Sequence, residues 1–486
     1  MLGKICYYRN MPTLYDEATT FPFPGAEARM AQYTINALLL EGQHFQAFGV
    51  KATNDFRKEY ERLRYVVANF NGLIAKVSAD SLFGEPLNFQ AENNQEWLAN
   101  FWHNNKLQTQ CFESSLSNAG LGDSVFRIRA ENEELIAEDV SPTMYFPHLD
   151  KLNPRRKPDV EELAWVAVYG KDRYLIRELY SLGFIITRVF KLKPKEGTTV
   201  NNEEEIDAEI LVDTFNQATG QNLVAFVETN VPDHNLIFHV PNYRLIGSKQ
   251  FFGTSDFIDT ETLQFALNNR LTKVDNVLDT HSDPILAVPP GVLDEDGKVK
   301  KESFGMFELT EESGELKPEY IVWNANLESA FKEIDKIVEM LFMTSETSPD
   351  VLGMGQGQAE SGTALKMRML RTLAKRNRKK LYYDQAITEM LIVAQKLGAT
   401  GYKVNGESVS VIDTPTLQWS DGIIDDPIEI TELASTQVDA GLKSKLTAMM
   451  EINGWTEEEA QAELDRIKGD QADFDPAIAN DSAVAE

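Results

Sequence analysis

The chain has 486 residues, of which 42% are hydrophobic, so it can bury substantial cores in roughly two to four structural units. Its 47 basic and 76 acidic residues give a formal net charge of −29. Because such a protein repels duplex DNA at long range, the charge argues against a protein that wraps DNA or reads its sequence. It does not exclude a protein through which DNA slides.

The composition also argues against secretion and against a membrane span. Cys6 and Cys111 are too few for a disulfide framework and lack metal-ligand spacing, which is typical of a reducing compartment such as a bacterial cytoplasm. The N-terminal segment lacks the apolar core of a signal peptide. Because charged side chains such as Arg177 and Arg188 interrupt the most apolar stretch, residues 174–192, we expect no transmembrane helix.

The N-terminal part is predicted to begin with two helices. In residues 54–77, large apolar side chains recur at three- and four-residue steps, which indicates an amphipathic helix. A second helical pattern covers residues 94–118 and is followed by Gly120 and Gly122, which favour a helix end.

A β-rich region follows. Three of its apolar runs are separated by turns at Gly170 and Gly183, which favours an antiparallel meander. Residues 194–207 are polar and are predicted to form a loop. The predicted strands are residues 124–129, 134–140, 142–147, 163–169, 174–180, 184–192 and 222–228.

Two amphipathic helices, residues 260–280 and 326–342, then bracket a β-rich insert, residues 283–324. Each helix is about 30 Å long, and a helical hairpin with a β cap is the simplest geometry. Such a hairpin leaves part of each apolar stripe without a partner, so we expect packing against copies of the same chain. The residues predicted to pack between subunits are Leu263, Leu267, Leu271, Val274, Leu278, Phe331, Ile334, Val338 and Leu341.

A glycine-rich loop, residues 347–361, precedes a predicted long helix, residues 362–397. The first half of this helix has a run of basic residues that no acid interrupts. Because acids are plentiful elsewhere, salt bridges between subunits are the first interpretation and contact with DNA phosphates is the second. The run comprises Lys366, Arg368, Arg371, Lys375, Arg376, Arg378, Lys379 and Lys380.

The C-terminal part is predicted to be mainly helical. A strand pair, residues 409–412 and 417–419, precedes helices at residues 430–452 and 456–467. Thr456 and Glu459 form the pattern of a capping box. The acidic segment at residues 470–486 has few large apolar groups, so we expect it to be disordered.

No constellation of residues indicates an enzyme, a metal site or a cofactor. Residues 357–363 approach the phosphate-binding glycine motif, but the lysine that should follow Gly362 is missing and the preceding element reads as helical. Residues 294–297 read as a turn rather than as a calcium loop. The histidines show no ligand spacing. A nucleotide-binding enzyme that uses the 353–363 glycine loop therefore remains only an alternative.

The order of these parts resembles the portal proteins of tailed double-stranded-DNA phages with long non-contractile tails. The resemblance lies in the segments Asn242–Gly247, Gly253–Asp256, Ser348–Gly353, Ser361–Lys366 and Trp419–Gly422, together with the stretch from Gly454 to Leu464. It covers most of the chain and depends on the order and spacing of the segments rather than on one motif.

The resemblance implies an α+β portal fold that assembles into a ring, usually of twelve subunits. In the terms of that family, the constriction of the channel would be formed by Pro349, Asp350, Val351, Leu352, Gly353, Met354, Gly355, Gln356, Gly357 and Gln358. The implied parts are a mixed α/β wing (1–258 and 362–430), two stem helices (259–282 and 325–346), a β-rich clip (283–324), a tunnel loop (347–361), a helical crown (431–469) and an acidic tail (470–486).

The function that the resemblance implies is mechanical. The ring at one capsid vertex would be the channel for DNA packaging, retention and ejection, and the platform for head–tail joining. The large terminase subunit would dock at the clip, and head-completion, major capsid and scaffolding proteins would be further partners, with no membrane involved. DNA would be contacted without sequence specificity, with Lys273, Lys332 and Lys336 as candidate stem contacts. The expected location is the virion, and the host cytoplasm during assembly. A structural head or adaptor protein that does not dock the motor is the other alternative.

Overall fold

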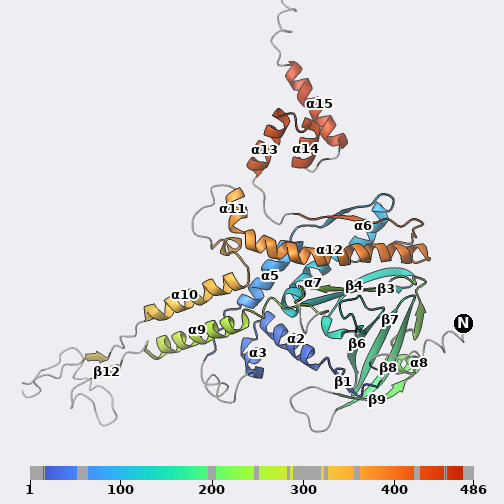
Figure 1. Cartoon of the computed structure of the whole chain (residues 1–486), viewed down its shortest axis with the longest axis vertical. Helices are drawn as coiled ribbons and strands as arrows, with labels where there is room; N and C mark the ends of the chain where they lie inside the picture. Colours follow the sequence, from blue (N-terminus) through green and yellow to red (C-terminus); the bar gives the residue numbers. More distant parts are fainter. Residues whose placement is uncertain are drawn as a thin grey trace, which may run out of the picture. The chain divides into compact units, whose positions relative to one another are not determined.

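The computed structural model describes residues 15, 17–51, 64–150, 152–194, 204–245, 251–281, 285–287, 319–321, 327–354, 362–420, 427–453, 455 and 457–473. The chain divides into two compact units (Figure 1). The first comprises Met1–Met354 and Arg371–Ser420, and the second comprises Gly355–Leu370 and Asp421–Glu486. No helix in the described ranges is long and apolar enough to cross a bilayer.

The largest sheet of the first unit is antiparallel and contains the predicted meander. Strands β6 (Val160–Tyr169), β7 (Asp172–Ser181) and β8 (Phe184–Pro194) pair in sequence order, and the turns at Gly170 and Gly183 have positive φ. The sheet order is β1-β9-β8-β7-β6-β5, with β10 also paired to β8. The remaining strands are β1 (Thr20–Phe21), β5 (Tyr145–Pro147), β9 (Glu204–Ile210) and β10 (Phe226–Glu228).

Three predictions in this region are wrong in part. Residues 204–207, predicted as loop, belong to β9, which pairs with β8; from Glu205 onward its acidic residues alternate with Ile206, Ala208 and Ile210, as in a strand. The strand predicted at residues 222–228 is shorter and covers only β10. The 142–147 segment begins as a 3-10 turn, η1 (Pro142–Met144), before β5.

A second sheet has the order β11-β3-β4, formed by β11 (Ile237–Pro241), β3 (Asp123–Glu131) and β4 (Glu134–Val140). A third joins β14 (Thr416–Gln418) to β2 (Asn88–Gln90), so the strand pairing predicted within residues 409–419 is wrong. The reason is that Asp413 accepts hydrogen bonds from the backbone amides of Asn93 and Asn94 at 2.6 and 2.9 Å, which holds its segment outside the sheet.

The two predicted N-terminal helices are interrupted, and residues 54–63 of the first lie outside the described residues. Residues 64–69 are not helical, and α5 (Phe70–Phe83) begins where the side chain of Asn69 accepts a hydrogen bond from the Gly72 amide. The pattern at residues 94–118 forms two helices, because Lys106 has a positive φ that breaks it. The helices of this region are α2 (Glu27–Leu40), α3 (His44–Lys51), α6 (Gln95–Asn104), α7 (Leu107–Leu121) and α8 (Val212–Thr219).

The long helix α12 (Leu370–Ala399) fills the main core of the first unit. Its Tyr383, Ile387 and Met390 are buried in one hydrophobic cluster with Phe126 of β3 and Phe238 of β11. The helix predicted at residues 362–397 is interrupted at Met369, which separates α11 (Gly362–Arg368) from α12.

The second unit contains α11 and the C-terminal helices α13 (Pro427–Asp439), α14 (Lys445–Asn453) and α15 (Glu457–Asp473). The single helix predicted at residues 430–452 is wrong, since Gly441 adopts a positive φ between α13 and α14. Helix α15 continues to Asp473, beyond the predicted end and into the segment expected to be disordered. Thr456 of the predicted capping box and residues 474–486 lie outside the described residues.

The predicted helical hairpin is observed as α9 (Glu261–His281) and α10 (Leu327–Thr344), which lie side by side (Figure 1). Beyond them, β12 (Ile285–Ala287) pairs with β13 (Glu319–Ile321) in an antiparallel arrangement. The rest of the predicted β insert, including residues 294–297, lies outside the described residues.

Helix α9 is buried on its polar face as well as on its apolar stripe. Gln264, Asn268 and Thr272, one turn apart from each other, are at most 1% exposed. Their side-chain oxygens accept hydrogen bonds from the backbone amides of residues 70, 68 and 66 at 3.2, 3.2 and 3.0 Å. The nonhelical segment 64–69 is thus held along α9 by polar side chains that lie beside the apolar stripe.

We expect Thr272→Val to destabilise the protein by about 1 kcal/mol, because the isosteric change leaves the Val66 amide without its acceptor. Thr262→Val, at an exposed position of the same helix, should change the free energy of unfolding by less than about 0.5 kcal/mol. Chemical denaturation of the two variants measures the difference, and equal stabilities would contradict the role of this hydrogen bond.

Candidate functional site

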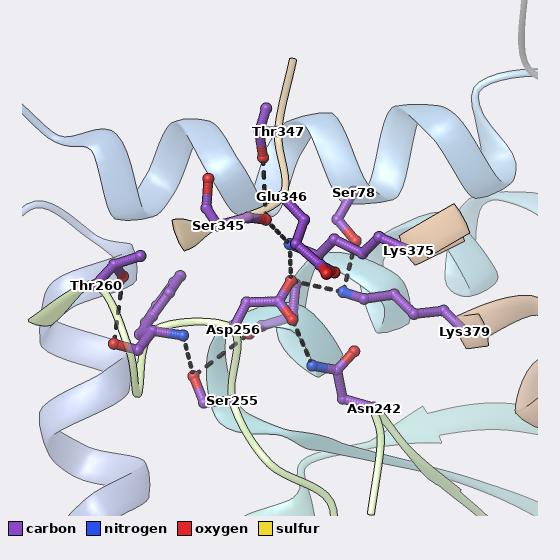
Figure 2. A network of polar contacts seen from close by, with 12 residues as sticks. Ser78, Asn242, Ser255, Asp256, Thr260, Ser345, Glu346, Thr347, Lys375 and Lys379 are labelled. Carbon is purple, nitrogen blue, oxygen red and sulfur yellow. Dashed lines mark hydrogen bonds and ion pairs between the residues drawn. The ribbon is translucent and has the colours of Figure 1, made fainter. Parts of the chain in front are cut away.

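The hairpin base, residues 253–260 before α9 and 345–348 after α10, is held on α12 by charged groups. Its central residue is Asp256, whose side chain is almost completely buried (Figure 2). Oδ2 of Asp256 lies 2.8 Å from Nζ of Lys375 and 2.7 Å from Nζ of Lys379. Nδ2 of Asn242, just after β11, donates to Oδ1 of Asp256 at 2.7 Å. A single carboxylate therefore pairs with two ammonium groups of α12.

The same two lysines reach the other elements around Asp256. Nζ of Lys375 donates to the carbonyl oxygen of Ser345, at the end of α10, at 3.0 Å. Nζ of Lys379 donates to Oγ of Ser78 on α5 at 2.6 Å. The network thus joins the segment before α9, the segment after α10, α5 and α12 (Figure 2).

A second set of contacts fixes the segment that leaves α10. The amide of Ser348 donates to Oγ1 of Thr372 at 2.8 Å, and that hydroxyl donates to the carbonyl oxygen of Glu346 at 3.2 Å. The Glu346 carboxylate forms ion pairs with Arg378 and, at 3.8 Å, with Arg371. Both ends of the hairpin are therefore attached to the first half of α12.

Electrostatics keep the Asp256 carboxylate ionised. Burial by itself raises the pKa of Asp256. The positive charges of Lys375 and Lys379 have the larger, opposite effect and hold this pKa well below the ordinary value of 3.8. Burial lowers the pKa of Lys379 to about 8, against the opposing effect of Asp256. At neutral pH the cluster thus holds buried charges of both signs, which is stable only while the partners stay together.

The basic run of the sequence does not act as one surface. Lys375, Arg376 and Lys379 are buried, and all three contact groups of their own chain. Arg376 donates to the backbone carbonyls of Ser81 and Ser420. Because these side chains point into the first unit, they are unsuited to contact with DNA.

The other candidate cations lie at the surface. Lys380 lies over the ring of Trp419, 5.6 Å from its centroid. Lys273 is exposed on α9. On α10, Lys332 and Lys336 are exposed and pair with Glu328 and Glu339 of the same helix at 2.6 and 2.7 Å. Lys366 and Arg368 belong to α11 of the second unit, where Arg368 is exposed.

The apolar residues of the hairpin divide into two sets. Leu267, Ile334 and Leu341 are buried between α9 and α10, and Leu263, Leu271, Val274 and Val338 pack against them. Leu278 and Phe331 are instead 48% and 47% exposed. Part of the predicted intersubunit stripe therefore packs within the chain, and these two residues remain available to another molecule.

The glycine-rich loop begins with a short 3-10 turn, η4 (Pro349–Leu352). The hydroxyl of Ser348 accepts a hydrogen bond from the Asp350 amide at 3.3 Å, and Gly353 closes the turn with a positive φ of 67°. Met354 is 60% exposed. Gly355, Gln356, Gly357 and Gln358 lie outside the described residues.

The role of Asp256 could not be identified from the sequence, although the residue lies in one of the family-like segments. Nothing in its local pattern distinguishes it from the chain's many other acids. Gln264, Asn268 and Thr272 carried a signal, since polar side chains at i, i+4 and i+8 share one helix face.

We expect Asp256→Asn to destabilise the protein by about 3–5 kcal/mol, because it leaves Lys375 and Lys379 buried without a counter-ion. Glu346→Gln is the control, since it removes a more exposed partner of arginine side chains and should cost about 0–1 kcal/mol. Denaturant unfolding of both variants measures the change in the free energy of unfolding. Equal changes would contradict the proposed role of Asp256 as the counter-ion of the buried lysines.

The pH dependence of stability gives an independent measure. The folded-state pKa of Asp256 lies below the ordinary value of 3.8, so its contribution is fully present above about pH 4 and is lost as the pH falls below that value. The free energy of unfolding of the wild type should thus fall more steeply below pH 4 than that of Asp256→Asn. Parallel curves for the two proteins would contradict the lowered pKa.

Comparison with known proteins gives a family match over most of the chain. The model of the family described as phage portal protein, SPP1 Gp6-like, matches residues 50–476. Among solved structures, a chain of the neck of a native GTA particle computed with C12 symmetry aligns with a TM-score of 0.41 and 12% identity, covering 79% of this chain and 89% of that one. No curated protein matches. Since the family match extends over far more than half of its residues, the chain belongs to the SPP1 Gp6-like phage portal protein family.

Proposed function

We propose that this chain is one subunit of a closed portal ring that conducts double-stranded DNA at one vertex of a phage capsid. The family match over residues 50–476 carries this proposal. The portal family is structural and not enzymatic. In the virion, the ring would serve packaging, retention and ejection of DNA, and it would join head to tail.

The surface of the hairpin supports ring formation. Leu278 of α9 and Phe331, Met340 and Met343 of α10 are each more than 40% exposed. Single exposed apolar side chains are common on monomeric proteins, but these four lie on both helices of one hairpin. A heterologous contact between neighbouring hairpins would bury them, and such contacts close when the subunits form a ring.

The charge of the chain suits a channel that does not retain DNA tightly. The net charge of −29 gives weak, repulsive long-range interaction with phosphates. Exposed Lys273, Lys332 and Lys336 would provide sparse contacts along the stem, and the two on α10 are partly neutralised by Glu328 and Glu339. Pro349–Gln358 would form the constriction.

The contacts between the hairpin base and α12 would keep the stem of the proposed channel in place under load. Under this proposal, the large terminase subunit docks at the clip, residues 283–324. The force that it exerts during packaging is then transmitted to α9 and α10, which flank the clip in the sequence. Because Lys375 and Lys379 hold both the entering and the leaving segment, the hairpin base would resist that load. Head-completion, major capsid and scaffolding proteins would be further partners, met during assembly in the host cytoplasm.

The nucleotide-binding alternative has less support. A phosphate-binding glycine loop needs a preceding strand, and here α10 and η4 precede the loop. The described residues contain no cluster of metal-ligating side chains. Saturable nucleotide binding by a small, non-ring form of the protein would restore this alternative.

Cryo-electron microscopy of the purified protein, with its mass from light scattering, tests the proposal. We expect a ring of about a dozen subunits with a bore of ~20 Å or more, wide enough for B-DNA. The same map would show whether Pro349–Gln358 line the narrowest point. A protein that stays monomeric even with its capsid and scaffolding partners would refute the portal ring.

We expect Phe331→Asp to prevent ring assembly while leaving the subunit folded, because Phe331 is exposed in the single chain but would be buried between hairpins. Ser329→Asp introduces the same charge at an exposed position on the same helix and should assemble normally. Light scattering and circular dichroism separate assembly from folding. Wild-type rings formed by Phe331→Asp would contradict the proposed packing.

A further inference from the structure

A cavity of about 230 Å³ lies in the first unit, and none of its lining residues belongs to the hairpin base. One wall comes from residues 155–161, which lead into β6. A second comes from β11 and the segment after it, with His239, Arg244 and Phe251. Helix α12 forms a third with Tyr382 and Glu389. The portal function proposed above does not use this cavity.

Three buried polar atoms of the lining residues have no hydrogen-bond partner within the described part of the chain. They are Nδ1 of His239, Oε2 of Glu161 and Nε of Arg244. The side chains of Glu161 and His239 are almost completely buried. A buried polar group without a partner costs about 1–3 kcal/mol, so three around one cavity indicate a polar occupant.

The charges around the cavity favour an anion. Lys157 is paired with Glu389, but among the described residues neither Arg155 nor Arg244 forms an ion pair with a carboxylate. Burial lowers the pKa of Arg244, and the positive charge of Arg155 acts in the same direction. Two guanidinium groups that disfavour each other would both be stabilised by an anion between them.

The anion must also donate a hydrogen bond. Nε2 of His239 lies 2.7 Å from Oδ1 of Asp123, a carboxylate whose pKa is low despite its burial. An ionised carboxylate only accepts, so Nε2 carries the proton. Burial lowers the pKa of His239, which keeps the ring neutral and leaves a lone pair on Nδ1. Tyr145 donates to Oε1 of Glu161. Burial raises the pKa of Glu161 to about 7, so its Oε2 is a second acceptor whenever this carboxyl is ionised.

We propose that this cavity binds inorganic phosphate, with phosphate oxygens accepting from Arg155 and Arg244 and a P–OH group donating to His239 or Glu161. Phosphate suits both requirements, because at neutral pH it is an anion that retains an O–H group. Sulfate, a carboxylate from another chain and the phosphodiester groups of DNA lack that proton. The arrangement therefore distinguishes free phosphate from the anions that a DNA channel or a subunit interface would present.

Titration calorimetry of the full-length protein at pH 7 tests the proposal, with phosphate and sulfate compared at equal ionic strength. We expect saturable phosphate binding and much weaker sulfate binding. Arg155→Gln and Arg244→Gln should each weaken phosphate binding by about tenfold or more, since each removes a charge-assisted hydrogen bond. Arg156→Gln is the matched control, because Arg156 pairs with Asp159 and does not line the cavity. Its phosphate affinity should stay within about twofold of the wild-type value.

Glu161→Gln tests the role of the proton. The glutamine can still accept from Tyr145 through Oε1, while its amide nitrogen would offer a donor to the cavity. We expect this variant to bind sulfate more tightly than the wild type does and to lose its preference for phosphate. Arg155 is exposed, so its variant remains informative if Arg244→Gln fails to fold.

Three outcomes would overturn the proposal. One is the absence of saturable phosphate binding, and another is equal affinity of the wild type for sulfate and phosphate. The third is a structure of the assembled protein in which a side chain of a neighbouring subunit fills the cavity between Arg155 and Arg244.

Discussion

The fold of the first unit depends on one buried carboxylate. Removing a charged group from water costs several kcal/mol, so Lys375 and Lys379 can be buried only because Asp256 lies between them. The second positive charge has no carboxylate of its own in this cluster, and the polar oxygens of Ser345 and Ser78 share the two ammonium groups with Asp256. This arrangement forces four separate segments to meet at one point, and the position of the α9/α10 hairpin follows from it.

The hairpin is consequently constrained at its base and exposed along its length. Gln264 and Asn268 attach one face of α9 to the nonhelical segment 64–69, while Leu267 and Leu341 fill the seam with α10. These contacts satisfy the hairpin's polar face and inner apolar face within the chain. Within the described part of the chain, Leu278 and Phe331 remain about half exposed, which is what a subunit of a ring requires under the proposed function.

The basic residues of α12 divide between the interior of the first unit and its surface. A run of like charges reads as a surface feature in the sequence, because lysine and arginine are rarely buried. Lys379 and Arg376 are nevertheless interior, one paired with Asp256 and the other with backbone carbonyls. Glu346, by contrast, pairs at the surface with Arg378. Helical periodicity separates these roles, since successive basic residues point to different sides of one helix.

The sequence by itself determined what local patterns control: the meander with its turns at Gly170 and Gly183, the α9/α10 hairpin, the helical C-terminal part and the family-like order of segments. It did not show where helices break: Lys106 adopts a positive φ although it is not a glycine, and Gly441 does so at the end of α13, where the Leu442 amide donates to the Gln437 carbonyl oxygen. Only the tertiary structure decided that Asp256 is the partner of the α12 lysines. Ion pairs between residues more than a hundred positions apart leave no periodic trace in a sequence, since they depend on how distant elements meet in space.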